Sequence, residues 1–182
     1  MSEPVSPLNG AVFDGFVQIR EVGPLGMITL RAKAGTKGLD KAIKAATGCS
    51  VPALRRIETQ GAKAAAWMSP DEYLLIVPYS ETDAALESVA KALKGQHHLA
   101  VNVSDARAVF RIDGDKADHV LRKLCPVDLD TITPGELRRT RAAQVAAAFW
   151  KDEAGFTLVC FRSVAAYVFG LLSTSARPDS AL

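Results

Sequence analysis

The spacing of hydrophobic residues along this chain changes several times between a repeat of two and a repeat of three to four. The longer repeat is typical of amphipathic helices, and strict alternation is typical of strands with one buried face. Three of the helical stretches follow a serine or threonine, which predicts Thr36, Ser80 and Ser163 as N-terminal caps. The expected helices cover residues 36–47, 80–94, 115–124 and 163–172.

Alternating or β-branched runs bounded by turn residues predict the strands. Residues 137–150 are the exception, because the first half alternates and the second half is almost entirely apolar. We interpret this segment as a long strand or a pair of strands, although its alanines also suit a helix. The other expected strands cover residues 16–20, 27–32, 54–58, 62–68, 73–77, 99–103, 108–112 and 156–161.

The order of these elements repeats, since strand–strand–helix–strands–helix occurs twice. It predicts an α+β protein of two similar halves, residues 15–97 and 98–173, each a ferredoxin-like (split βαβ) unit with a mostly antiparallel sheet. Residues 1–14 contain prolines and a glycine without periodicity and predict an extended N-terminal arm. Residues 174–182 predict a flexible tail.

Composition narrows the function classes. Twenty-two Lys and Arg against 20 Asp and Glu leave a formal net charge of +2, too balanced for a nucleic-acid-binding field. The first residues lack the cationic and apolar regions of a signal peptide, and no run of 18 apolar residues predicts a membrane span. Cys49, Cys125 and Cys160 are far apart and odd in number, which predicts reduced, buried thiols in a cytoplasmic protein.

The sequence contains few candidate catalytic motifs. The phosphate-binding glycine fingerprints and the serine-hydrolase elbow are absent from the sequence. The adjacent His97 and His98 make a poor chelate, and His119 is expected on the solvent side of its helix. The loop at residues 35–38 (GTKG) opens a helix and offers amides to an anion, or simply forms the turn that leads into the helix.

Charged clusters complete the set of candidates. The acid pairs Asp113/Asp115 and Asp128/Asp130 stand beside helix ends, where carboxylates cap backbone amides. The densest basic cluster is Arg138, Arg139 and Arg141. On a strand, Arg139 and Arg141 share one face and are candidate contacts for a carboxylate ligand or for acidic residues of a partner; a charged, solvated strand edge is the alternative. The sequence predicts no catalytic and no metal-binding residue.

Five segments between residues 60 and 172 also match, in order, the motifs of one known family. They are residues 67–75 (WMSPDEYLL), 103–108 (VSDARA), 121–129 (LRKLCPVDL), the group Pro134, Gly135, Thr140 and Gln144, and residues 162–168 (RSVAAYV). The chain thereby resembles the sarcosine oxidase gamma subunit family, whose fold is similar to the folate-binding domain of glycine-cleavage aminomethyltransferase. Residues 1–50 add little to the resemblance.

The resemblance implies an accessory subunit of heterotetrameric sarcosine oxidase. That enzyme oxidises sarcosine to glycine, produces hydrogen peroxide and passes a one-carbon unit to tetrahydrofolate or releases it as formaldehyde. The resemblance also implies that the larger alpha and beta subunits hold FAD, FMN and NAD and that a small delta subunit completes the complex. It further implies that the gamma chain has no assigned catalytic residue. This chain lacks the K-G-C-[YF]-x-G-Q-E motif of a wider relative, the folate-dependent iron–sulfur maintenance protein.

Two functions stay open beside a less favoured nucleic-acid module: an accessory flavoenzyme subunit, or a stand-alone folate or small-carboxylate binder that uses Arg139 and Arg141. Val145, Phe149 and Trp150 exceed the needs of a half-exposed strand, so they face either this chain's own core or a partner. We expect the arm to become ordered on that partner, so that removing residues 1–12 weakens assembly and leaves the isolated fold intact.

Overall fold

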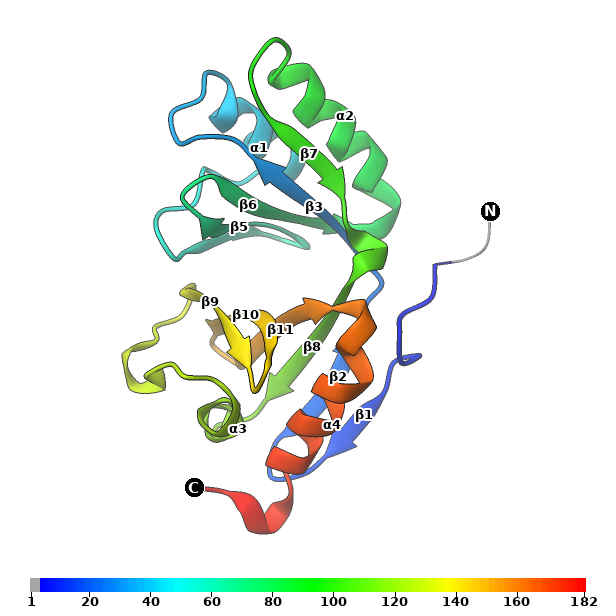
Figure 1. The fold of residues 1–182 in the computed structure, drawn as a ribbon, viewed down its shortest axis with the longest axis vertical. Helices are drawn as coiled ribbons and strands as arrows, with labels where there is room; N and C mark the ends of the chain where they lie inside the picture. Colours follow the sequence, from blue (N-terminus) through cyan, green and yellow to red (C-terminus); the bar gives the residue numbers. More distant parts are fainter. Residues whose placement is uncertain (1–3) are drawn as a thin grey trace. The chain divides into compact units, whose positions relative to one another are not determined.

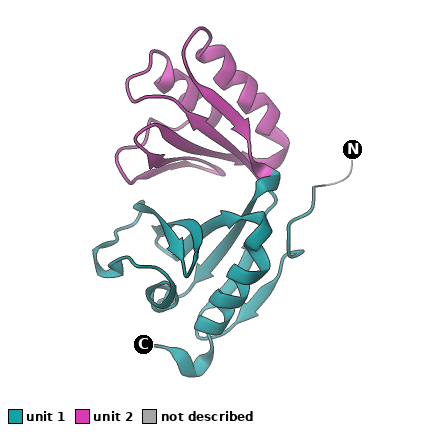
Figure 2. Ribbon diagram, viewed as in Figure 1, with its two compact units in different colours: residues 1–24, 105–182 teal, residues 25–104 magenta. Residues whose placement is uncertain are grey.

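The computed structural model describes residues 4–182, which form two compact units (Figure 2). Unit 2 is continuous, Leu25–Ser104, and unit 1 combines the residues up to Pro24 with Asp105–Leu182. Residues 1–3 of the expected arm lie outside the described part. Within residues 4–182, no helix is long and apolar enough to cross a membrane.

Unit 2 is a five-stranded sheet in the order β4-β5-β6-β3-β7, with two helices on one face (Figure 1). Without β4, this is the strand order of a split βαβ unit, in which two helices connect crossing strands. A short 3-10 turn, η1 (Tyr79–Glu81), leads into the second helix. The elements are β3 (Leu25–Arg31), α1 (Leu39–Thr47), β4 (Ile57–Gln60), β5 (Lys63–Ser69), β6 (Glu72–Pro78), α2 (Thr82–Ala92) and β7 (Leu99–Asn102).

Unit 1 repeats this plan in a six-stranded sheet of order β1-β2-β8-β11-β10-β9, with α3 and α4 over one face. Its neighbouring strands, like those of unit 2, are paired antiparallel. The α+β class with two ferredoxin-like units is therefore confirmed. The elements are β1 (Val12–Asp14), β2 (Gln18–Val22), β8 (Arg107–Asp113), α3 (Ala117–Leu124), η3 (Leu129–Thr131), β9 (Leu137–Ala142), β10 (Val145–Asp152), β11 (Gly155–Phe161), η4 (Arg162–Val164), α4 (Ala165–Ser175) and η5 (Pro178–Ser180). The 3-10 turn η2 (Ser104–Ala106) begins at the last residue of unit 2 and continues into unit 1.

The division between the units differs from the expected halves, residues 15–97 and 98–173. β2 does not join the strand that follows it but pairs with β8, from Gln18 opposite Asp113 to Val22 opposite Val109. β7 in turn pairs with β3 and stays in unit 2. Unit 1 thus takes the two strands at one edge of its sheet, β1 and β2, from the start of the chain, because the buried side chain of Ile19 belongs to the core under α3 and α4.

The helices pack through apolar stripes of helical spacing, although Ala90, an expected member of the stripe on α2, is exposed. In α1, the residues Leu39, Ala42, Ile43 and Ala46 are buried, and Gly48 ends the helix in a left-handed conformation (φ 78°). The predicted caps are wrong: the Thr36 hydroxyl donates to the Lys33 carbonyl instead, at 2.7 Å. Ser80 and Ser163 lie in the 3-10 turns η1 and η4, so their helices begin two residues later, without a side-chain cap.

Residues 137–150 form most of the hairpin of β9 and β10, which confirms the strand pair and excludes the helix. The chain reverses at Ala143, which adopts a positive φ of 51°, between Ala142 and its partner Val145. Phe149 is fully buried in the unit 1 core, where its ring meets Phe156 edge-on at 5.8 Å. Phe149 therefore faces the chain's own core, whereas Trp150 is only half-buried.

The arm and the tail are both held by hydrogen bonds. The Glu21 side chain, 7% exposed, accepts hydrogen bonds from the Ser6 hydroxyl and from the amides of Leu8 and Gly10 at 2.8–3.2 Å. Residues 12–14 of the expected arm are strand β1. In the expected tail, the Lys123 ammonium donates to the carbonyls of Ser175 and Ser180. The N-terminal arm from Ser6 onward and the tail as far as Ser180 therefore contribute to the fold of unit 1.

Candidate functional site

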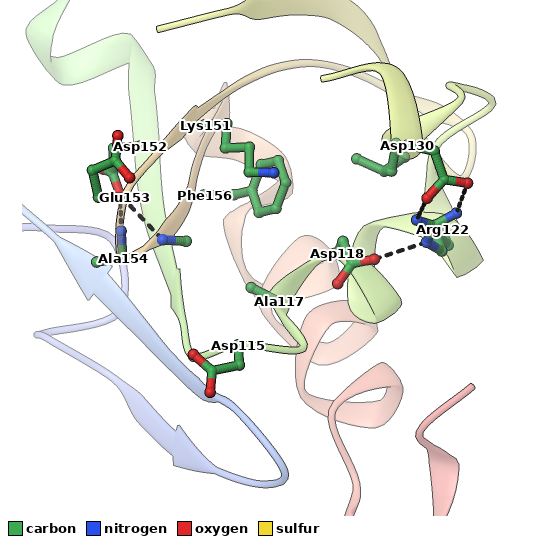
Figure 3. Close-up of a pocket in the computed structure, with 13 residues that line it drawn as sticks. Asp115, Ala117, Asp118, Arg122, Asp130, Lys151, Asp152, Glu153, Ala154 and Phe156 are labelled. Atoms are coloured by element: carbon green, nitrogen blue, oxygen red, sulfur yellow. Dashed lines mark hydrogen bonds and ion pairs between the residues drawn. The ribbon is translucent and has the colours of Figure 1, made fainter. Parts of the chain in front are cut away.

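The candidate site is a polar cavity of about 450 Å³ in unit 1 (Figure 3). Three segments enclose it: the start of α3 with the loop before it, the 3-10 turn η3, and the tip of the β10–β11 hairpin. These segments come together because β8 and β11 are neighbours in the sheet and α3 follows β8 directly. The charged residues that line the cavity are Asp115, Asp118, Arg122, Asp130, Lys151, Asp152 and Glu153.

Arg122 organises one wall. Its Nε donates to Asp118 one helical turn earlier, at 2.9 Å, and its Nη1 donates to Asp130 on η3, at 3.1 Å (Figure 3). The hydrogen bond from Arg122 and its charge hold the pKa of Asp130 below its usual range. Asp130 is therefore ionised at neutral pH, and its role here is to tie η3 to α3 rather than to donate a proton.

Arg111 lies behind the opposite wall, in the middle of β8. Its side chain is only 12% exposed and is paired with Asp113 and with Asp152, and its Nη1 also donates to the Thr157 hydroxyl at 2.8 Å. Burial of Asp152 opposes ionisation. Hydrogen bonds from Arg111 and from the Ala154 and Gly155 amides outweigh that effect, so the pKa of Asp152 is lowered. The Arg20 guanidinium, 3.1 Å from Asp113, extends the network to β2.

Lys151 supplies the remaining cation. Its ammonium lies 5.7 Å from the centroid of the Phe156 ring and donates to the Ile132 carbonyl at 3.3 Å. Asp115 and Glu153 lie on the rim, on the loop before α3 and on the hairpin tip. The other lining carboxylates are paired with arginines, so their charges are fixed in place. These charges suit the binding of a ligand, and the ion pairs support the hairpin.

The acid residues predicted to cap helix ends have different roles in the structure. Asp128 caps η3 as expected, because its carboxylate accepts from the Asp130 amide at 3.1 Å. Asp113 and Asp130 pair with arginines instead of capping amides, which the sequence did not predict. The signal that was missed is Arg111 itself, a charged residue in the apolar strand segment VFRI, which requires partners.

The basic cluster lies on β9, an edge strand of the unit 1 sheet. Arg138 is paired with Glu136, and the side chains of Arg139 and Arg141 are exposed. Side chains two residues apart on a strand point to the same side, so Arg139 and Arg141 share one face. Neither lines the cavity of Figure 3.

The histidines and cysteines have structural surroundings. His98 Nδ1 lies 2.9 Å from the Gln96 carbonyl, and His119 Nδ1 accepts from the Leu182 amide at 3.1 Å. The three thiols are free and buried, as predicted, and burial raises the pKa of Cys125 to about 12. Burial likewise raises the pKa of Cys160 to about 11. No group of three potential metal ligands occurs within residues 4–182.

Comparison with known proteins gives a consistent result. Residues 31–177 match the model of the sarcosine oxidase, gamma subunit family. The chain is 34% identical over 140 residues to a sarcosine oxidase subunit gamma of Corynebacterium sp. (strain U-96), across 74% of this chain and 66% of that one. A subunit of the same name from Arthrobacter sp. is 32% identical, across 75% and 68%. The aligned part thus spans about two thirds of these relatives.

Solved structures extend the likeness. A chain of the heterotetrameric sarcosine oxidase from Corynebacterium sp. U-96, solved in complex with pyrrole 2-carboxylate, superposes with a TM-score of 0.82 at 28% identity, across 94% of this chain and 90% of that one. Aminomethyltransferase T of the glycine cleavage system from Bartonella henselae superposes with a TM-score of 0.64 at 10% identity, across 84% and 44%. At that identity the second likeness concerns the fold alone.

These findings define first the structural class: the chain is an α+β protein of two ferredoxin-like units with the fold seen in aminomethyltransferase T. Within that class, it belongs to the sarcosine oxidase, gamma subunit family.

Proposed function

We propose that this chain is the gamma subunit of a heterotetrameric sarcosine oxidase and acts there as an accessory subunit. The observation that carries the proposal is the likeness to a chain of the Corynebacterium enzyme over nearly the whole length of both chains. In this proposal the complex oxidises sarcosine to glycine, produces hydrogen peroxide and transfers a one-carbon unit to tetrahydrofolate. The complex works in the cytoplasm.

The partners in this proposal are larger alpha and beta subunits that bear the flavins, and a small delta subunit. FAD, FMN and NAD bind to the larger subunits and none binds to this chain. The absence of the glycine-rich phosphate fingerprints from the sequence supports this division, because a dinucleotide needs backbone amides that cradle its phosphates.

The test is to co-express the chain with its candidate partner subunits and to isolate the complex through a tag on the gamma chain. We expect flavin absorbance and peroxide production with sarcosine in the complex, and neither in the isolated chain. A stoichiometric flavin band on the isolated chain contradicts the accessory role, and failure to recover any flavoprotein contradicts the subunit assignment.

Arg139 and Arg141 are proposed to contact carboxylates of a partner subunit. Their exposure on one face of an edge strand supports this role, since a guanidinium binds a carboxylate through paired hydrogen bonds. The competing function is a stand-alone folate or small-carboxylate binder that uses the same two residues. The two functions differ in whether the arginines serve assembly or ligand binding.

A double variant, Arg139→Gln with Arg141→Gln, separates them. We expect reduced recovery of the complex and no change in tetrahydrofolate titration of the isolated chain. Arg177→Gln is the matched control, because Arg177 is also exposed but lies in the C-terminal segment. Micromolar tetrahydrofolate binding that disappears in the double variant, with assembly intact, favours the stand-alone binder.

A further inference from the structure

A second cavity, of about 340 Å³, opens at the start of α1 in unit 2. The loop of residues 34–38 forms one side, and the first turn of α1 with Val51 and Tyr73 forms the rest. This is the GTKG loop, whose sequence left open either an anion site or a plain turn. The cavity shares no residue with the site of Figure 3.

The N-terminus of α1 is left without a cap. Among the described residues, the amides of Asp40 and Lys41 have no hydrogen-bond partner, since the first internal bond of the helix runs from the Ala42 amide to the Gly38 carbonyl. The cap position holds Gly38 at φ 88°, and a Cβ there lies 2.7 Å from the Ala92 carbonyl oxygen. Glycine is therefore required at this position, and the free amides carry the partial positive charge of the helix N-terminus.

Tyr73 adds a side-chain hydroxyl to this cavity from strand β6, independently of the helix N-terminus. The residue is only 3% exposed, and within residues 4–182 its hydroxyl has no hydrogen-bond partner. The Tyr73 hydroxyl is accessible to solvent. Among the described residues, Ser173 Oγ is the only fully buried side-chain oxygen or nitrogen without a hydrogen-bond partner, so the unpartnered Tyr73 oxygen is not fully buried. Tyr73 thus brings an unpaired donor to the cavity that it lines. Burial raises its pKa, so the hydroxyl keeps its proton at neutral pH.

The remaining walls define the shape of the occupant. Leu39, Val51 and Ala34 are apolar, and the charges of Lys37 and Asp40 have opposite sign. The local positive field therefore comes mainly from the helix terminus and suits a single negative charge. A doubly charged phosphate lacks the cations that such a group normally recruits.

We propose that this cavity binds a carboxylate carried on a small apolar body. The carboxylate oxygens accept hydrogen bonds from the Tyr73 hydroxyl and from the first-turn amides of α1, and the body lies against Leu39 and Val51. The inference does not rest on the proposed function, because it concerns a ligand of this chain by itself.

The test is a titration of the ¹⁵N-labelled full-length chain with benzoate, followed by amide chemical shifts. We expect saturable shifts at Asp40 and Lys41, and an affinity about tenfold lower in Tyr73→Phe, which is the loss typical of one hydrogen bond to a charged group. Tyr167→Phe is the matched control: it deletes the same hydroxyl from a 47% exposed residue on α4, and benzoate affinity should not change.

Inorganic phosphate serves as the competing probe in the same titration, and we expect it to bind at least tenfold more weakly than benzoate. The proposal is overturned if benzoate moves neither amide in the wild-type chain, if Tyr73→Phe binds benzoate as well as wild type does, or if phosphate binds equally well. A thermal melt of both variants shows that they are folded, and the wild-type titration decides the matter even if one of them is not.

Discussion

The two units share one fold but use the sheet face opposite their helices in different ways. In unit 1 this face carries the ionic network of Arg20, Arg111, Asp113 and Asp152 across strands β2, β8 and β10. On the same face of the unit 2 sheet, alternation places apolar residues. They are Met27, Ile57, Ala64, Ala66, Leu74 and Ile76, all buried.

The difference shows where each unit concentrates its directional interactions. Arg111 is nearly buried and is paired with both Asp113 and Asp152, and of these two only Asp113 is also paired with Arg20. The ion pairs of unit 2 are exposed, as between Arg31 and Asp71, whose side chains are 51% and 45% exposed. Exposed pairs contribute little to stability, whereas breaking a buried pair leaves a charge without compensation. Single polar changes should therefore destabilise unit 1 more than unit 2.

The largest effect is expected from Gly155→Ala, at the hairpin end of the unit 1 network. Gly155 has a φ of 150°, and a Cβ there lies 2.1 Å from the Ile112 carbonyl oxygen. Strain and backbone displacement should cost at least about 3 kcal/mol of unfolding free energy, measured by urea denaturation. Gly61→Ala is the control, because Gly61 also has a positive φ but no atom within 4 Å of an added Cβ. An equal loss in both variants contradicts the prediction.

Removing the central charge should rank next. Arg111→Met leaves Asp113 and Asp152 without their shared cation and should cost about 2–3 kcal/mol, below the full value for a buried pair because the carboxylates are partly exposed. Arg111→Lys should recover only part of this, since an ammonium lacks the planar fork. Arg31→Met in unit 2 should leave the urea midpoint unchanged. If both Met variants shift the midpoint equally, the contrast between the units fails.

A smaller loss is expected at the N-terminal segment of unit 1. Glu21→Gln replaces one carboxylate oxygen with an NH₂ group that cannot accept hydrogen bonds from the Ser6 hydroxyl or the Leu8 and Gly10 amides. We expect a cost of about 1–2 kcal/mol by thermal or urea unfolding. Deleting residues 1–12 should then also destabilise the isolated chain, because a buried carboxylate loses its partners. If the truncated chain is as stable as the full chain, this prediction is wrong and the arm serves only in docking to a partner.

The smallest effect concerns pH. The folded-state pKa of Asp152 is lowered, so its ionised form stabilises the fold above the ordinary pKa of 3.8, and this contribution disappears as pH falls through the lower folded-state value. Unfolding free energy should therefore decrease between pH 5 and pH 3. Arg111→Met should flatten this decrease, because the pKa of Asp152 then returns toward its ordinary value. An identical dependence of unfolding free energy on pH in both chains would show that Asp152 does not cause the acid sensitivity.

Local pattern predicted much of this fold. The stripe of α1, its end at Gly48 and the β9–β10 strand pair follow from residues within a few positions of one another. The helix caps failed because the chain tightens into 3-10 turns before α2 and α4, a choice that propensity at Ser80 or Ser163 does not reveal. Of the candidate sites, the shared face of Arg139 and Arg141 and the loop at residues 35–38 were singled out from the sequence, and the cavity of Figure 3 was not.

The sequence by itself determined the four helices, the strands other than β1, their order, the duplicated plan and the family, because hydrophobic period and short motifs are local properties of the chain. Only the tertiary structure decided that β2 joins the unit 1 sheet beside β8, that Arg20 meets Asp113 at a separation of 93 residues, and that Tyr73 lines the cavity at the start of α1. The physical reason is that burial and charge pairing depend on which distant strands become neighbours, and each local pattern is compatible with several neighbours.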